Sequence, residues 1–150
     1  MSYKDFVIND FLDEKFQIAF KEYFKELGIE VKDWNGLFKE INEDKNTQAI
    51  VRMENDNVIG FIMFQPIVFE SWFFEEKCGF IREFWIANEC RNLGNGSSLL
   101  DKVETYFKNQ GIFRTILTTN TANDFYVKHG YKLLKSSIAK NNEAVYVKIL

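Results

Sequence analysis

The segment that most constrains the fold runs over residues 80–118. It begins with a strand-like run to Ala87, passes through the turn Gly94-Asn95-Gly96, and continues as an amphipathic pattern that stops at Gly111. A second strand-like run, residues 112–118, follows at once. Strand, helix and strand in such close succession favour two parallel strands joined by a right-handed crossover. The sequence therefore predicts a mixed sheet.

Two amphipathic helices are expected before most of this sheet. Apolar residues recur at three- and four-residue intervals over residues 10–27, and Gly28 stands in the stop position. A shorter pattern runs from about Asp33 to Ile41 and ends in the polar stretch 42–46.

A β-meander is predicted between the helices and the glycine turn. The turn-forming Asn55-Asp56-Asn57 separates the strand-like runs AIVRME and VIGFIMF, which indicates a hairpin. Two more strands are expected at 68–74 and 80–87, connected through residues 75–79, and Pro66 is expected to mark a break or bulge.

The last part of the chain is predicted to add one helix and two strands. Residues 121–124 resemble a capping box, and the helix they would open stops at Gly130. Strands are expected near 131–135 and 144–149. The length of 150 residues and the absence of linkers or repeats predict a single domain, residues 1–150.

Charge and composition exclude several functions. The net charge of -3, with Lys interleaved among Glu and Asp, argues against nucleic-acid binding. No apolar run is long enough for a membrane span and the first residues do not resemble a signal peptide, so we expect no membrane partner and a cytoplasmic location. Cys78 and Cys90 lack metal-site or redox spacing and are expected to be reduced thiols, with no metal bound.

The turn at Arg91 to Gly96 is the strongest functional signal from the residues themselves. Glycines allow close backbone approach, and N–H groups at the start of a helix attract phosphate or pyrophosphate. A nucleoside triphosphate is disfavoured because Ser97 and Ser98, rather than Lys and Ser or Thr, follow Gly96. A dinucleotide is disfavoured because Leu99 stands where a third glycine is needed. A merely flexible connection is the alternative.

Two motifs resemble those of one enzyme family. The string RNLGNG resembles the Arg/Gln-x-x-Gly-x-Gly/Ala signature of the GNAT superfamily of acyl-CoA N-acyltransferases. The stretch NTANDFYVKHGYKLL resembles the family's C-terminal motif, with Ala122, Phe125-Tyr126, Lys128 and Gly130-Tyr131 at the family's spacing. The hairpin MENDNVIGFIMF resembles the family's central antiparallel pair, and the resemblance covers most of the chain.

The resemblance implies a fold and a co-substrate. The fold is an α/β (α+β) architecture with a mixed, mostly antiparallel sheet of about six or seven strands, about four helices and splayed central strands. The co-substrate is acetyl-CoA, whose pantetheine arm inserts between those strands because its amides need backbone partners. Implied contacts to the arm are Ile86 and Ala87, with Asn120 or Asn123 at its far end, although both Asn residues also suit helix capping. The implied cradle of the pyrophosphate is the backbone of Arg91, Asn92, Leu93, Gly94, Asn95, Gly96 and Ser97.

The implied reaction is direct attack of a primary amine on acetyl-CoA. The N–H of Ile86 would stabilise the oxyanion and Tyr126 would protonate the leaving sulfur, the alternative being that Tyr126 only packs in the core. The family's acidic residue falls on Phe80, which leaves Glu83, a water molecule or an already neutral amine as alternatives for the base. His129 is expected to cap or pack at a helix end.

The acceptor and the partners are less constrained. Lys102 and Lys128 either meet the cofactor's 3′-phosphate or are solvated surface. A small-molecule amine, such as a polyamine or aminoglycoside, and a protein amino group all fit an acidic, aromatic rim. A homodimer is compatible with edge strands and exposed aromatic residues. The alternatives to an enzyme are a non-catalytic acyl-CoA sensor and a purely structural domain. The expected rim consists of Trp34, Glu70, Trp72, Phe73, Glu75 and Glu76.

Overall fold

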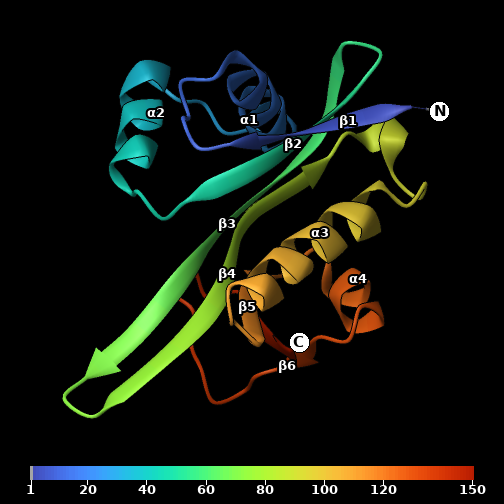
Figure 1. Ribbon diagram of the computed structural model, residues 1–150. Coiled ribbons are helices and arrows are strands. Elements are labelled where there is room, and N and C mark those ends of the chain that lie inside the picture. The colour runs from blue at the N-terminus through green and yellow to red at the C-terminus, as the bar shows by residue number, and fades with distance from the viewer. Residues whose placement is uncertain (1) are drawn as a thin grey trace. The chain divides into compact units, whose positions relative to one another are not determined.

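The computed structural model describes residues 2–150 and contains a seven-stranded sheet with the strand order β1-β2-β3-β4-β5-β7-β6 (Figure 1). Contacts divide the chain into two compact units. Unit one contains the residues up to Phe64 and Glu83–Leu100, and unit two contains Gln65–Arg82 and Asp101–Leu150. The strands are β1 (Tyr3–Ile8), β2 (Gln48–Glu54), β3 (Asn57–Ser71), β4 (Phe74–Ile86), β5 (Arg114–Thr119), β6 (Lys132–Leu133) and β7 (Ala144–Ile149). The helices are α1 (Glu14–Leu27), α2 (Trp34–Glu43), the 3-10 turn η1 (Asn88–Cys90), α3 (Asn95–Asn109) and α4 (Asn123–Lys128).

The first sheet strands of unit one are antiparallel. β1 pairs with β2 from Tyr3 opposite Glu54 to Ile8 opposite Ala49. β2 turns into β3 through Asn55 and Asp56, whose φ angles of 50° and 65° lie in the left-handed region that favours such residues in hairpin turns. The predicted hairpin is therefore confirmed.

Both predicted N-terminal helices form, with slightly shifted ends. Asp13 accepts hydrogen bonds from the N–H groups of Lys15 and Phe16 and so starts α1 three residues after the expected region begins. Gly28 ends α1 with a φ of 71°. In Figure 1, α1 and α2 lie side by side over β1 and β2, where their aromatic side chains build the core of unit one. The rings in edge or stacked contact with Phe16 are those of Phe11, Phe20, Phe38 and Phe61.

Strands β3 and β4 differ from the prediction. β3 runs unbroken through Pro66 to Ser71, and the turn is Trp72-Phe73 rather than residues 75–79. Pro66 is tolerated because the pairing of β3 with β2 ends at Phe64, so the missing N–H interrupts no rung of that ladder. The prediction of a break at Pro66 is therefore wrong. β1 was not predicted at all. Its sequence YKDFVI mixes polar and apolar residues without alternation, because β1 is an edge strand whose side chains are mostly accessible to water.

Unit two contains the predicted parallel pair. β4 and β5 pair at Gly79 with Thr115 and at Phe80 with Ile116, and both strands continue beyond these two rungs. This short pairing is what the splayed central strands were expected to show. Gly79 is required by close packing, since a Cβ there would lie 2.4 Å from the ring of Phe107 in α3.

The last elements of unit two are β5, β7 and β6, which are antiparallel neighbours. The predicted capping box at 121–124 is wrong. The N-cap of α4 is Ala122, which makes no side-chain cap bond, and Thr119 Oγ1 instead accepts from the N–H groups of Thr121 and Ala122. The Thr119 hydroxyl thus replaces the cap that sequence spacing had assigned to Thr121.

A buried polar triad lies beneath this part of unit two. The Tyr131 hydroxyl donates to Glu104 Oε2 at 2.8 Å, and Lys148 Nζ is 2.8 Å from Glu104 Oε1. Burial, and then the adjacent Glu104 carboxylate, raise the pKa of Tyr131 well above its ordinary value. Tyr131 is therefore a neutral hydrogen-bond donor at physiological pH.

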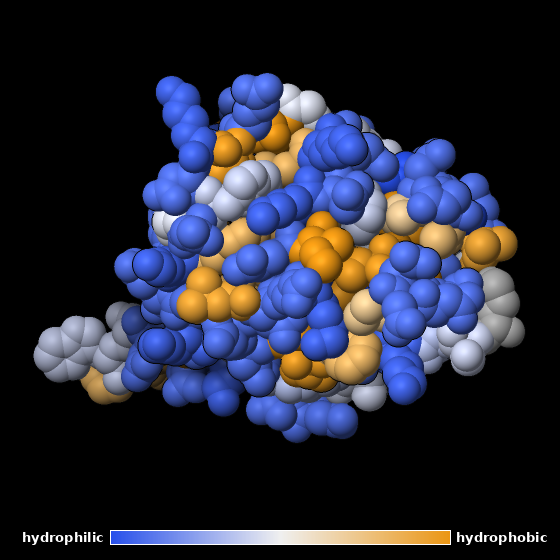
Figure 2. Space-filling view, turned by 90° about the horizontal axis from the view of Figure 1, so that it is seen from above, coloured by the Kyte–Doolittle hydropathy of each residue, from blue (hydrophilic) through white to orange (hydrophobic). Residues whose placement is uncertain are grey.

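The surface is mainly polar. Figure 2 shows polar residues over most of the face in view, with apolar residues in small groups between them. Within residues 2–150, no helix is long and apolar enough to cross a membrane. Cys78 and Cys90 are both free thiols.

Candidate active site

The glycine turn of unit one has the geometry of an anion site. Asn92 and Gly94 have φ angles of 62° and 88°, so left-handed residues recur along the loop. The first bond of α3 runs from the Ser98 N–H to the Gly94 carbonyl, which leaves the N–H groups of Asn95 and Gly96 without an intrahelical acceptor. No acidic residue lies in the first turn of α3. The free backbone N–H groups and the positive end of the α3 dipole therefore both point to the space in front of the first turn of α3.

The space above the turn also suits a ligand. A Cβ placed on Gly94 would meet no protein atom within 4 Å, and Arg91, Asn92 and Leu93 are exposed. The turn thus presents an open backbone surface, which is what a pyrophosphate needs from a helix N-terminus.

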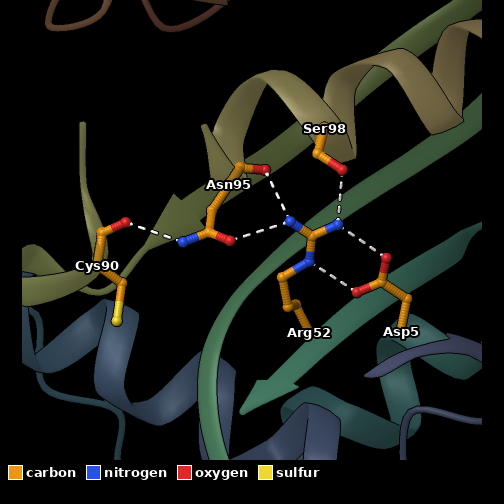
Figure 3. Close-up of polar contacts among 5 residues, drawn as sticks. All are labelled: Asp5, Arg52, Cys90, Asn95 and Ser98. Atoms are coloured by element: carbon orange, nitrogen blue, oxygen red, sulfur yellow. Dashed lines mark hydrogen bonds and ion pairs between the residues drawn. The ribbon is translucent and has the colours of Figure 1, made fainter. Parts of the chain in front are cut away.

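A buried arginine holds this turn in place (Figure 3). Arg52 of β2 is 1% exposed and forms a two-point ion pair with Asp5 of β1, at 2.8 and 2.9 Å. The same guanidinium donates to Asn95 Oδ1 at 3.0 Å and to Ser98 Oγ at 2.8 Å. Asn95 Nδ2 in turn donates to the carbonyl of Cys90. The first turn of α3 is therefore anchored to β1 and β2 by one side chain.

The side chain of Arg91 makes contacts of its own. Its Nε donates to the carbonyl of Ile86 at 2.8 Å, and its Nη2 is 2.7 Å from Glu26 Oε2 of α1. Arg91 therefore links the start of the turn to the end of β4 and to α1.

Ile86 and Ala87 have different backbone surroundings. The Ala87 N–H donates to the carbonyl of Ile59 at 2.8 Å, and the Ala87 carbonyl accepts from the N–H of Cys90. Because successive residues of a strand direct their backbone groups to opposite edges, the amide of Ile86 faces away from β3. Of the two residues, Ile86 is the one placed to pair with a further strand-like ligand.

The other predicted site residues belong to unit two. Tyr126 of α4 is 5% exposed and its ring packs against Phe125 and Tyr131. Asn123 Nδ2 donates to the hydroxyl of Tyr146 at 3.0 Å. Asn120 Oδ1 accepts from the N–H of Ala144 at 3.0 Å. Neither Asn caps α4, so the capping alternative is wrong for both.

The remaining candidates are placed as follows. His129 Nδ1 lies 2.8 Å from the carbonyl oxygen of Phe125 and its ring stacks on Phe125, which confirms a role at the helix end. Glu83 is half-buried, and its Oε2 accepts from the hydroxyl of Tyr23 in α1 at 2.6 Å. Lys102 and Lys128 lie at exposed positions on α3 and α4.

A groove of 740 Å³ lies in unit one beside the end of β4. Trp85 and Ala87, on either side of Ile86, are among its lining residues. The Trp85 indole N–H is buried and has no hydrogen-bond partner within residues 2–150. Burial raises the pKa of the Cys90 thiol, and the nearby carboxylates of Glu89 and Glu54 add to this effect. The charged residues of the lining are Glu22, Lys25, Glu26, Glu54 and Glu89.

The residues of the expected acceptor rim belong to both units. Trp34 is half-buried in unit one, with its ring 5.6 Å from that of Phe24 and 5.7 Å from that of Phe38. Trp72 and Phe73 are almost wholly exposed in unit two, and Glu76 there pairs with Arg114. Trp34 is thus a partly buried residue that packs against the core of unit one.

Comparison with known families identifies the chain. The Acetyltransferase (GNAT) family matches residues 7–131, which include the glycine turn and α4. The chain belongs to the GNAT acetyltransferase family. It uses acetyl-CoA as its co-substrate.

Solved structures share the fold of this GNAT protein at low sequence identity. The PaiA N-acetyltransferase of Thermoplasma acidophilum, solved with coenzyme A, is 17% identical, with a TM-score of 0.68 over 100% of both chains. The ribosomal-protein-alanine N-acetyltransferase of Brucella melitensis biovar Abortus 2308 is 13% identical, with a TM-score of 0.75 over 92% of this chain and 98% of that chain. An aminoglycoside acetyltransferase from an uncultured soil metagenomic sample, solved with sisomicin, is 17% identical, with a TM-score of 0.62 over 85% and 84%.

Sequence reasoning missed three residues that organise the site of this acetyltransferase. Arg52 sat in a predicted strand as an ordinary charged residue, and its partners Asp5 and Ser98 are far from it in sequence. Tyr23 was assigned to the core face of a helix, although its hydroxyl binds Glu83. Glu26 gave no signal of its contact with Arg91. Only the pairing of distant segments makes these contacts visible.

Proposed function

We propose that the chain is an N-acetyltransferase that moves the acetyl group of acetyl-CoA onto a primary amine by direct attack. The observation that carries the proposal is the open turn at the start of α3, where Gly94 has a φ of 88° and unobstructed space above it. Support comes also from the family match and from the N-acetyltransferases that share the fold. The backbone of Arg91 to Ser97 would hold the pyrophosphate, and Ile86 the pantetheine arm.

The reaction needs three events, each with a proposed group. The amine nitrogen attacks the thioester carbonyl carbon, and the N–H of Ile86 stabilises the resulting oxyanion. The carbon–sulfur bond then breaks, and Tyr126 gives the proton that the leaving sulfur takes up. Asn123 or Asn120 would bind the far end of the pantetheine arm. The support for this role is the match of Tyr126 to the family motif, and its ring is held in place by packing against Phe125 and Tyr131.

The amine proton is taken up either by Glu83 or without help from a side chain. Glu83 is half-buried and accepts a short hydrogen bond from Tyr23, so its carboxylate is held by α1. A water molecule, or an amine that arrives neutral, is the other option. Replacing Glu83 with Gln separates the two: if Glu83 is the base, the acidic limb of the rate profile against pH disappears.

We propose a cationic amine as the acceptor. Four carboxylates and one lysine line the groove beside Ile86, and Glu26 is the one that pairs with Arg91. Excess negative charge in a concave surface attracts cations and orients them before reaction. Among the proteins that share the fold, one was solved with the cationic aminoglycoside sisomicin and one is named for acetylating a protein alanine. We therefore propose both a small amine and a protein amino group as candidate acceptors.

An acyl-CoA sensor without turnover is the alternative function. It would share the Gly94 turn but would not depend on Tyr126. We also propose a homodimer, for which the surface is argued below, and a cytoplasmic location. The two free thiols, Cys78 and Cys90, support a reducing compartment.

The test is release of CoA thiol from acetyl-CoA across a panel of mono-, di- and polyamines, an aminoglycoside and an amino-terminal peptide. We expect turnover with at least one cationic amine and a fall of about 10²–10⁴-fold in kcat for Tyr126→Phe, the usual contribution of a general acid. Calorimetry on the same variant should give unchanged acetyl-CoA binding. The matched control is Tyr106→Phe, a half-buried tyrosine of α3, which should keep wild-type kcat.

Binding without turnover on any amine would favour the sensor. Full activity of Tyr126→Phe would remove this residue from the mechanism while leaving the transferase assignment intact. Failure to bind acetyl-CoA would refute both functions.

A further inference from the structure

Strands β3 and β4 end in a two-stranded arm, which we define as residues 65–78 and which lies in unit two. Its tip is the pair Trp72 and Phe73, 94% and 99% exposed. Three more apolar side chains along the arm, Val68, Phe69 and Phe74, are 48%, 57% and 59% exposed. In Figure 1 the arm is the long green and yellow-green ribbon that ends in a tight turn. The arm therefore carries five large apolar groups in water.

Local folding does not require aromatic residues at this tip. Two-residue hairpin turns favour Asn, Asp and Gly, because these adopt the left-handed backbone that the turn needs. The β2–β3 hairpin of the same chain follows that rule with Asn55 and Asp56. Trp72 and Phe73 bring no such advantage to the turn, so a contact outside the turn is needed to explain them.

The arm also lacks the support that a hairpin of this length normally has. The rungs between β2 and β3 end at Phe64, and those between β4 and β5 begin at Gly79. Between these points the described residues form a ribbon of two strands only. Two-stranded ribbons are marginally stable in water and gain stability when an apolar face is covered. The arm is thus a surface that a partner would complete.

We propose that this partner is a second copy of the chain, which packs arm against arm in a two-fold homodimer. Aromatic side chains bury about 150–250 Å² each, so the four aromatic groups of the arm provide on the order of 600 Å² per copy. A standard stable interface needs about 800 Å² per partner. The apolar area of one arm thus approaches the area that one partner contributes to such an interface, before any polar contact is counted.

The arm has a receiving surface as well as a projecting one. A groove of 370 Å³ is lined by Phe69, Glu70, Ser71, Phe74, Glu76 and Arg114, next to the tip. Because tip and groove lie on one arm, a two-fold axis lets each copy insert its tip into the groove of the other. Such an isologous contact is satisfied by two chains and does not propagate into a fibre.

The charges of the arm favour a second copy over other occupants. Glu70, Glu75 and Lys77 are exposed, so both signs are present on each copy and can be paired across a two-fold axis. An anionic lipid surface or a nucleic acid would need a basic patch, which these three residues do not provide. Pro66 lacks a backbone N–H group, which disfavours strand pairing at that point of β3.

The experiment is sedimentation equilibrium of the full chain across about 1 to 100 µM, where a dimer shows concentration-dependent mass. Wild type should sediment as a dimer. Trp72→Ser combined with Phe73→Ser should raise the dimer dissociation constant by at least about 30-fold, the loss expected when an interface loses aromatic hot spots. The matched control is Ile138→Ser, which removes an apolar side chain that is 92% exposed in the same unit but outside the arm. This control should remain dimeric.

The double variant should fold normally, because its two side chains touch little of their own chain. Far-UV circular dichroism and acetyl-CoA binding should therefore match wild type, which separates loss of the dimer from loss of the fold. A wild-type chain that is monomeric at the highest concentration would overturn the proposal. So would a double variant that dimerises as tightly as wild type. Binding of a monomeric wild type to anionic vesicles that depends on Trp72 would instead assign the arm to a lipid.

Discussion

Arg52 shows how a single residue can link the sheet to the co-substrate site. Its guanidinium is buried, pairs with Asp5, and reaches Asn95 and Ser98 at the start of α3. The Tyr3 ring adds a further contact, 3.7 Å from the guanidinium carbon. Burying a charge is costly unless its donors are satisfied, and the guanidinium donates five hydrogen bonds to Asp5, Asn95 and Ser98. The network is therefore an anchor for the turn at which we propose that acetyl-CoA binds.

We expect Arg52→Met to lower the free energy of unfolding by about 3–5 kcal/mol, because it leaves the Asp5 carboxylate buried without its partner. The KM for acetyl-CoA should rise as well, since Asn95 loses the contact that holds it. Urea unfolding and steady-state kinetics measure the two effects. Ser98→Ala is the control and should cost about 1 kcal/mol, the usual loss of one hydrogen bond. A fully stable Arg52→Met protein would contradict this account of the anchor.

At the scale of the element, the turn before α3 has a backbone conformation that only certain residues adopt easily. Gly94 has a φ of 88° and Asn92 one of 62°. Gly111, which ends α3, has a similar φ of 76°, and neither glycine would bring a Cβ within 4 Å of a protein atom. The two glycines that flank α3 thus have similar backbone conformations, and a Cβ would meet no protein atom at either one. They differ in one respect: a bound ligand is proposed next to Gly94 and none is proposed next to Gly111.

Gly94→Ala and Gly111→Ala should therefore lose similar stability, about 1–2 kcal/mol each for a left-handed residue with a Cβ. Only Gly94→Ala should weaken acetyl-CoA binding, by about 10-fold or more, because its methyl group occupies space meant for the pyrophosphate. Isothermal titration calorimetry and thermal unfolding check the pair. Equal binding by the two variants would argue against pyrophosphate contact at Gly94.

The element scale is also where sequence reasoning succeeded most and failed most clearly. Periodicity found α1, α2 and α3, because each buries one apolar stripe. It failed at β1, whose polar edge sequence carries no alternation, and at Pro66, which was assigned a break. A proline interrupts a strand only if its missing N–H was needed, and that depends on whether a neighbouring strand reaches it.

At the scale of the whole molecule, the two units are joined by continuous elements. β3 and β4 both begin in one unit and end in the other, and α3 passes from Leu100 to Asp101 across the same division. Neither unit therefore contains all residues of β3 or of β4. We propose on this ground that residues 1–150 unfold as one domain.

Gly79→Ala tests this cooperativity. A Cβ at Gly79 would overlap the Phe107 ring, and overpacking of this kind costs about 1–3 kcal/mol. The change lies in unit two, whereas Trp34 and Trp85 report on unit one. In a Trp72→Phe background, tryptophan fluorescence and far-UV circular dichroism should shift to the same lower midpoint. Separate transitions would show that the units unfold independently.

The sequence alone determined the order of most elements, the glycine turn that opens α3, and the family. These features are local, because they depend on periodicity, turn chemistry and short motifs. Tertiary structure decided that Arg52 anchors the turn, that Tyr23 binds Glu83, that Trp34 packs against Phe38, and that Trp72 and Phe73 are exposed at a tip. Those properties depend on which distant segments pack together, and a hydrophobic or charged residue carries no local signal of the partner it will meet.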